Sequence, residues 1–363
     1  QFDEGKKEYN AAIARYETIR MVSIAAIVLG IGFAVVFGWM LVTGISRALG
    51  EAIDTASAVA EGDLTRSITT SGSDEVAQLL KALAHRALLW GLRAPRLAHP
   101  VMPEGLALPG QQIRPVWIEG EGGSQLFGWF IAPPAHQALP APAAVLMHGW
   151  GAHAGLMLPA APWLHEAGLA LLVLDARGHG LSSAVDFQSL PRFAQDVEAG
   201  LAWLRQQPEV DASRLALIGH SVGAGAVLLS ATRQPDVRAV ISLSAFAHPA
   251  EIMQRWLTEM RIPTRWPGRW ILSHVQEVIG ARFDDIAPLR SAAAVSCPIL
   301  FVHGQDDETV PFTDALRLAQ ASGAGEGACM AVPGGHDLTV GLGPDHVQRM
   351  TRFLRASLQL SPA

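Results

Sequence analysis

The alternation of apolar and polar positions divides the chain into two unlike parts. Residues 21–46 contain no charged side chain, and the run is long enough to cross a bilayer as a helix. Beyond residue 113, shorter apolar runs recur between segments with helical periodicity. The pattern therefore predicts one transmembrane helix at 21–46 and a separate α/β domain in the C-terminal part of the chain.

Two short amphipathic segments follow the long apolar run. Apolar residues recur at steps of four, three and four from Leu49 to Ala60, and at heptad-like steps from Val76 to Leu83. The stretch "EGDLTRSI" separates them. Two such helices can bury their apolar stripes in a parallel bundle only with a partner chain. The pattern therefore favours a homodimer formed through these helices.

The same segments carry a family resemblance. "VAEGDLTRSI" and "SDEVAQLLKAL" resemble the connector and second helix of a HAMP domain, and the apolar run resembles the last transmembrane helix of a methyl-accepting chemotaxis receptor. "YNAAIARYETIR" is similar to the end of that receptor's periplasmic sensor. The resemblance implies a sensor end at 1–20, a single membrane span at 21–46 and a HAMP-like domain at 47–83. It also implies an inner-membrane protein whose C-terminal part is cytoplasmic.

The C-terminal part shows the pattern of a mostly parallel sheet. "RPVWIEG" and "SQLFGWFIAP" flank a Gly-rich turn and predict a hairpin. Helical segments such as "PRFAQDVEAGLAWLRQQ" then alternate with nearly continuous apolar runs, which are typical of strands buried on both faces. These runs are "AAVLMHG", "LALLVLDARG", "RLALIGH", "VRAVISLSAF" and "CPILFVHG". The predicted fold is therefore a doubly wound α/β fold.

Composition and charge exclude several classes of site. The net charge is −6 and there is no long basic block, which argues against a nucleic-acid partner. The two cysteines, Cys297 and Cys329, form no C-x-x-C pair and no cluster with histidine. Neither a zinc site nor a disulfide framework is predicted, and we assign no metal ligand.

One serine has the setting of a catalytic nucleophile. In "ALIGHSVGAGA", Ser221 follows an apolar strand and precedes a helix rich in small residues, at the G-x-S-x-G spacing. A serine on such a turn projects above the sheet, and glycines two before and two after it, Gly219 and Gly223, allow strand and helix to approach closely. The helix N-terminus also favours developing negative charge. We predict that Ser221 is a nucleophile on a strained turn.

A serine nucleophile needs a base and an acid that orients the base. In this setting they follow the serine in the order Asp, His. "FVHGQDDETVPF" offers Asp306 and Asp307, of which the pattern H-G-x-x-D-x-x-V-P favours Asp307, and "VPGGHDL" offers His336. The backbone amides of Trp150 and Val222 are the predicted oxyanion donors. Three other histidines have weaker claims: His148 follows a strand, His220 is expected to point away from the turn, and His303 to be structural.

Together these motifs carry a second resemblance. "HGWG", "DARGHG", "GHSVG", "HGQDDETVP" and "GGH" occur in this order and resemble the α/β-hydrolase family, in its esterase and serine-aminopeptidase-like branch. The likeness covers about residues 85–363. It implies a Ser-His-Asp acyl-transfer enzyme that needs no cofactor.

The resemblance completes the predicted organisation of the chain. Residues 84–112 are assigned to a linker and the start of the hydrolase, and 113–363 to the hydrolase domain. Residues 247–296, where tryptophans interleave with arginines, are predicted to form a small cap. Two functional hypotheses remain. One is a membrane-tethered serine hydrolase acting on an ester, thioester or amide; the other is a HAMP-containing signalling receptor fragment with a hydrolase-fold output module.

Overall fold

The chain divides into two compact units, residues 1–85 and 86–363. In the first unit residues 30–40 are helical, whereas the predicted segments at 1–20 and 47–83, and most of the predicted span, lie outside the described residues. Among the described residues, no helix has both the length and the apolar character needed to cross a membrane. The computed structural model describes residues 30–40, 42, 85, 86, 88, 89, 91–97, 99–103, 113–265, 268–338 and 341–360.

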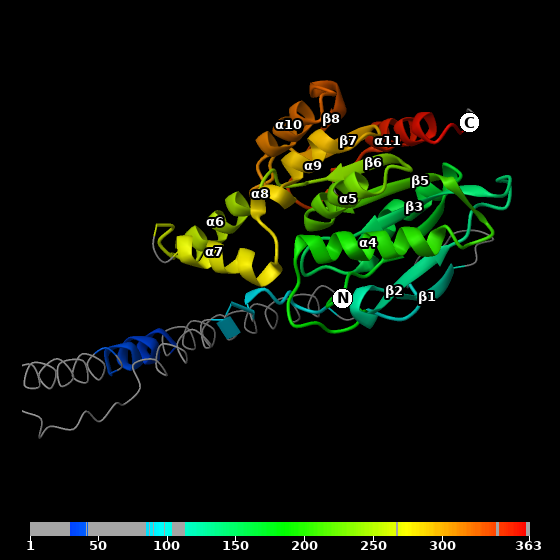
Figure 1. Cartoon of the computed structure of the whole chain (residues 1–363). Coiled ribbons are helices and arrows are strands. Elements are labelled where there is room, and N and C mark those ends of the chain that lie inside the picture. The colour runs from blue at the N-terminus through cyan, green and yellow to red at the C-terminus, as the bar shows by residue number, and fades with distance from the viewer. Residues whose placement is uncertain are drawn as a thin grey trace, which may run out of the picture. The chain divides into compact units, whose positions relative to one another are not determined.

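A single sheet organises the second unit (Figure 1). Its strands are Ile113–Glu119 (β1), Gln125–Ile131 (β2), Ala141–Met147 (β3), Ala170–Leu174 (β4), Val210–His220 (β5), Val237–Leu243 (β6), Ile299–Gly304 (β7) and Cys329–Val332 (β8). They lie in the order β1-β2-β4-β3-β5-β6-β7-β8. β2 runs antiparallel to β1 and β4, and every later pair is parallel.

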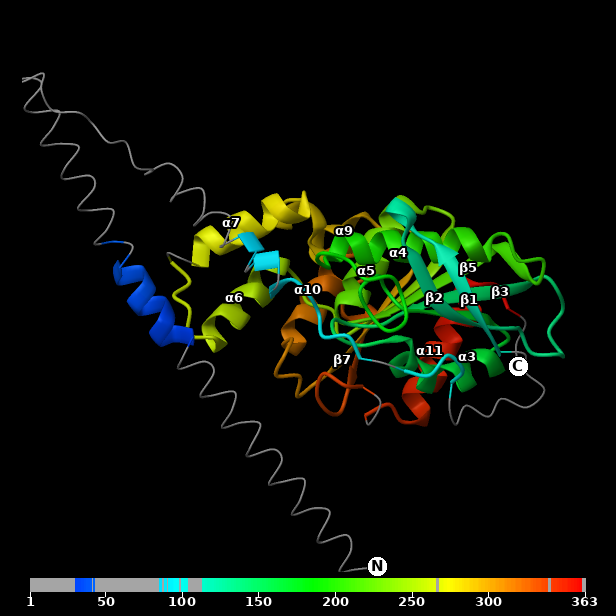
Figure 2. The same cartoon turned by 90° about the horizontal axis from the view of Figure 1, so that it is seen from below.

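Helices cover both faces of this sheet (Figure 2). One face carries Leu190–Leu204 (α4), Val222–Arg233 (α5), Pro288–Ala294 (α9) and Phe312–Ala321 (α10), and the other carries Ala161–Glu166 (α3) and Pro344–Ser357 (α11). Successive strand side chains point to opposite faces. Val145 therefore belongs to the first apolar core and Leu146 to the second. Two such cores explain why the strand sequences are almost continuously apolar.

The predicted doubly wound fold is confirmed. The predicted hairpin is β1–β2, in which Trp117 is paired with Phe127. The later apolar runs form β3 to β7, and the helix expected after Ser221 is α5. The helix expected at 191–207 is α4, which begins one residue earlier, where Ser189 caps it by accepting from the Arg192 amide.

The excursion predicted as a cap contains four helices. Pro249–Glu259 (α6) and Gly268–Ile279 (α7) lie together at the edge of the sheet where β6 ends (Figure 1). They are followed by the short helix Phe283–Ile286 (α8) and by α9. α9 packs against α5 and α10, and its Ala292 lies in the first core. The last helix of the excursion therefore packs with the helices that cover the sheet.

Candidate active site

Ser221 occupies a strained turn between β5 and α5. Its backbone has φ 55° and ψ −117°, in a region that non-glycine residues rarely adopt. The turn is held because the Ser221 amide donates to the Leu243 carbonyl at 2.8 Å and the Ser221 carbonyl accepts from Gly225 at 3.2 Å. The predicted strand–turn–helix context is confirmed. It places the half-buried serine at the carboxyl ends of the parallel strands.

The two glycines of the motif are required by close backbone contacts. A Cβ atom on Gly219 would collide with the carbonyl of Gly223, and one on Gly223 would collide with the carbonyl of His148. The first turn of α5 thus rests directly on β5 and on the end of β3. Larger residues at either position would push the helix away and carry Ser221 with it.

Asp307 and His336 meet at the same edge of the sheet. His336 Nδ1 donates to Asp307 Oδ2 at 2.8 Å, while Oδ1 accepts from the amides of Thr309 and Val310 at 2.9 and 2.8 Å. Burial raises the pKa of Asp307, but the hydrogen bonds of His303, His336 and Val310 outweigh burial and hold the pKa far below its usual range. The carboxylate is therefore ionised. It fixes the His336 tautomer in which Nε2 is free to accept a proton.

The neighbouring candidates have different surroundings. Asp306 is exposed, and its amide donates to Gly334 at 3.0 Å. His303 is buried, donates from Nε2 to the Val310 carbonyl at 2.8 Å, and lies 3.3 Å from Asp307 Oδ2. His303 therefore stabilises the ionised Asp307 carboxylate. The i, i+4 spacing of the two residues could have suggested this contact.

His220 has a contact that sequence reasoning missed. Its Nε2 donates to the carbonyl of His336 at 2.9 Å, and the two rings lie 4.9 Å apart. Burial, the largest influence, lowers the pKa of His220, which favours the neutral ring. Because His220 directly precedes Ser221, this contact holds the loop that carries His336 beside the strained turn of Ser221.

The loop formed by residues 148–153 approaches the serine from β3. A Cβ on Gly149 would lie 3.1 Å from Ser221 Cβ, so the two backbones are in contact. His148 accepts from the Ala176 amide at 3.0 Å and donates from Nδ1 to the Gly149 carbonyl at 2.7 Å. Burial, aided by His179, lowers the pKa of His148 to about 3, so that the ring is neutral and keeps this tautomer.

The carbonyl of Gly149 determines where the next amide points. In a trans peptide, C=O and N–H point in opposite directions. The Gly149 carbonyl faces His148 and accepts from Ala152 at 3.2 Å, so the Trp150 N–H faces away from both. Within the described part of the chain, neither the Trp150 nor the Val222 amide donates a hydrogen bond.

Two family models match the chain. Residues 139–280, which include Trp150, Ser221 and Val222, match the model described as serine aminopeptidase, S33. Residues 40–85 match the HAMP domain. Over residues 139–280 the chain is similar to the S33 serine aminopeptidase-like α/β hydrolases. The first match identifies the C-terminal part as a serine hydrolase. The second suggests a membrane-associated signalling protein, because HAMP domains occur in such proteins. The described residues contain no group of three or more histidine, cysteine or acidic side chains suited to hold a metal ion.

Individual proteins are similar to the same part of the chain. An uncharacterised protein of Mycobacterium tuberculosis strain H37Rv is 28% identical over 243 residues, which cover 66% of this chain and 77% of the relative. Cutinase 2 of Thermobifida cellulosilytica is 30% identical over 119 residues, 33% of this chain and 35% of that enzyme. The esterase Pf2001 of Pyrococcus furiosus superposes with a TM-score of 0.57 at 19% identity, over 74% of this chain and 98% of the esterase. At that identity, the esterase shows the fold alone.

Proposed function

We propose that the chain is a membrane-tethered serine hydrolase that cleaves an ester, thioester or amide through an acyl-enzyme. Ser221 is the nucleophile, His336 the base and Asp307 the acid that orients the base. One observation carries the proposal: an ionised aspartate holds a histidine by a 2.8 Å hydrogen bond beside a serine in the elbow conformation. The same Asp–His pair beside a serine in an unstrained turn would not present a nucleophile above the sheet.

The proposed reaction gives each group one role. Ser221 Oγ attacks the substrate carbonyl while His336 Nε2 takes its proton, and Asp307 stabilises the resulting imidazolium. The negative charge that develops on the carbonyl oxygen is met by the amides of Trp150 and Val222. His336 then gives its proton to the leaving group. Water repeats the sequence on the acyl-enzyme and releases the acid.

The site needs no cofactor for these steps, and the substrate is an acyl compound. The similarity to a cutinase over a third of the chain supports an ester before an amide. On the cap, Trp256, Arg269 and Trp270 are all exposed. Such a surface suits an acyl group with an apolar or an acidic portion.

The N-terminal part supplies the tether. The apolar run 21–46 and the HAMP match at 40–85 support a single-pass inner-membrane protein with a cytoplasmic hydrolase, paired through its HAMP helices. The same match supports a second candidate function, in which the HAMP domain passes an external cue to the hydrolase. Equal fluorophosphonate labelling of the full chain and of residues 86–363 would favour an autonomous enzyme, and unequal labelling would favour the receptor.

The test of the mechanism is the removal of one oxygen atom. Ser221→Ala in the full chain, kept in mild detergent, should abolish both fluorophosphonate labelling and hydrolysis of p-nitrophenyl acetate, since loss of a triad member costs many powers of ten in rate. Ser213→Ala is the matched control, because Ser213 is an exposed serine on the same strand. A folded Ser221→Ala protein that kept most of its activity would refute the assignment.

A further inference from the structure

The segment just before the hydrolase core is bound along its length to that core. We call residues 92–103 the strap; residue 98 lies outside the described residues. The strap follows the HAMP match, which ends at residue 85. Its polar contacts include Arg93 Nε to Asp186 O at 2.8 Å, Ala94 N to Gln188 Oε1 at 2.8 Å, Arg96 Nε to Gly180 O at 2.7 Å, and Trp129 Nε1 to Val101 O at 2.7 Å.

His99 is the strap residue that reaches a buried charge. Its Nε2 donates to Asp175 Oδ2 at 2.7 Å, and its Nδ1 donates to the Pro100 carbonyl at 2.9 Å. Both partners can only accept, so both ring nitrogens carry protons and the ring is an imidazolium. The side chain is only 3% exposed, and the ring lies 4.8 Å from that of His153 and 4.9 Å from that of Trp129.

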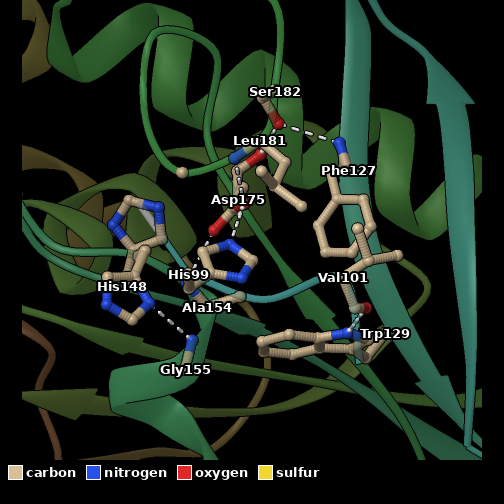
Figure 3. Close-up of polar contacts among 12 residues, drawn as sticks. His99, Val101, Phe127, Trp129, His148, Ala154, Gly155, Asp175, Leu181 and Ser182 are labelled. Atoms are coloured by element: carbon tan, nitrogen blue, oxygen red, sulfur yellow. Dashed lines mark hydrogen bonds and ion pairs between the residues drawn. The ribbon is translucent and has the colours of Figure 1, made fainter. Parts of the chain in front are cut away.

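Asp175 connects the strap to the 148–153 loop (Figure 3). Its side chain is fully buried, and Oδ1 accepts from the Ala154 amide at 2.6 Å. Ala154 begins the 3₁₀ helix Ala154–Ala160 (η2), directly after the loop that contains Trp150. Oδ2 also accepts from the Leu181 amide at 2.8 Å. One carboxylate thus holds together the strap, the end of the 148–153 loop and the loop after β4.

The middle of the 148–153 loop is held from the same side. The Gly151 amide donates to His179 Nε2 at 3.1 Å. Gly151 has φ 70°, and a Cβ there would lie 3.1 Å from the ring of Pro95, which is part of the strap. The strap therefore contacts the residue next to Trp150 directly, and contacts the end of the loop through Asp175.

We propose that His99 is a positioning residue for hydrolysis: through Asp175 it holds the 148–153 loop in the conformation that points the Trp150 amide at the oxyanion. The proposal rests on the proposed function of that amide. His99 touches neither the substrate nor the triad. Its role is to donate a hydrogen bond to the carboxylate that also holds the end of the loop.

The physical reason is the cost of a buried carboxylate with too few hydrogen-bond donors. Without a donor at position 99, Asp175 keeps only the amide donors of Ala154 and Leu181, and a buried carboxylate that has lost a hydrogen-bond donor is destabilised. It relaxes by taking up a proton or water, which weakens its hydrogen bond to Ala154. Loss of a whole oxyanion donor costs about 10²- to 10³-fold in kcat, so a displaced donor should cost about 10- to 100-fold. KM should change little, because the amide acts on the transition state.

Two amide substitutions separate the two hydrogen bonds of His99. His99→Gln places an N–H near the position of Nε2 and can still donate to Asp175. His99→Asn places one near Nδ1, so it keeps the bond to Pro100 and loses Asp175. We expect Gln to retain most of kcat for p-nitrophenyl acetate and Asn to lose about 10- to 100-fold. Backbone amides of residues 150–154 should exchange hydrogen faster in the Asn protein than in the Gln protein.

Arg93→Gln is the control for a general loss of stability. It removes the hydrogen bond from the strap to the Asp186 carbonyl, and Asp186 does not belong to the 148–153 loop. It should lower Tm without changing kcat. Equal kcat and equal exchange in the Gln and Asn proteins would overturn the positioning role, as would a loss confined to KM. A wild-type chain without any activity would instead overturn the proposed function, and hydrogen exchange would still decide whether His99 holds the loop.

Discussion

At the scale of single residues, the two aspartates after β7 differ in what they contact. Asp307 holds His336, whereas Asp306 is exposed. Asp307→Asn should lower kcat by about 10⁴-fold, because an amide can donate to Nδ1 and leaves His336 in the wrong tautomer. Asp306→Asn should stay within a few-fold of wild type. Ester hydrolysis by the two full-chain variants checks this, and the reverse ranking would show that the acid is Asp306.

The pair of His99 and Asp175 predicts a pH dependence of stability. Burial lowers the pKa of His99, but the hydrogen bond and charge of Asp175 outweigh burial and raise it; burial raises the pKa of Asp175, but His99 and the surrounding donors lower it. The ion pair is therefore complete between about pH 4 and 6.5, the ordinary values of the two groups. Its contribution is lost as pH rises through the raised pKa of His99, or falls through the lowered pKa of Asp175.

The matching measurement compares wild type with His99→Gln, which cannot become charged. The difference in Tm between the two proteins should be larger at pH 6 than at pH 9. The surrounding histidines His148 and His179 are present in both proteins, whereas His153 lies beside His99. Burial and the charge of His99 lower the pKa of His153, so the difference in Tm includes the response of His153. A difference that is constant or grows toward pH 9 would contradict an imidazolium at position 99.

At the scale of elements, the strap can be separated from the sheet. Within the described part of the chain, the eight strands and the buried residues of both apolar cores lie between residues 113 and 360. We therefore expect proteins of residues 86–363 and 104–363 both to fold. The shorter protein lacks Pro95 and His99, so its kcat should fall by about the 10- to 100-fold expected for a displaced oxyanion donor. Ester hydrolysis and circular dichroism of both proteins test this; equal rates would mean that the strap only covers the surface.

At the scale of the whole molecule, the orientation in the membrane is the main prediction. The receptor resemblance places everything after Arg47 in the cytoplasm. The flanking charges favour the opposite orientation, since Lys6, Lys7, Arg15 and Arg20 precede the apolar run and only Arg47 follows it closely. A C-terminal reporter that fluoresces only in the cytoplasm should be bright. A dark but stable fusion, together with activity of a periplasmic reporter at the same position, would place Ser221 outside the inner membrane.

Most of the fold was predictable because its signals are local. Strands buried on both faces must be apolar at nearly every position, and this pattern marks β3 to β7 without any knowledge of their neighbours. The elbow is equally local, since Gly219, Ser221 and Gly223 form a strand, turn and helix within five residues. The order of Ser221, Asp307 and His336 along the chain also follows from the motif. The HAMP match agrees with the amphipathic pattern on either side of Gly62.

What the sequence by itself determined is therefore the α/β fold, the serine turn and the order of the candidate triad. Only the tertiary structure decided that β4 lies between β2 and β3, that His220 and His303 contact the Asp–His pair, and that the predicted linker contains a strap. His99 and Asp175 are 76 residues apart. No local pattern specifies such a contact, because it depends on which loops the sheet brings to one edge and on a buried carboxylate that must find a cation there.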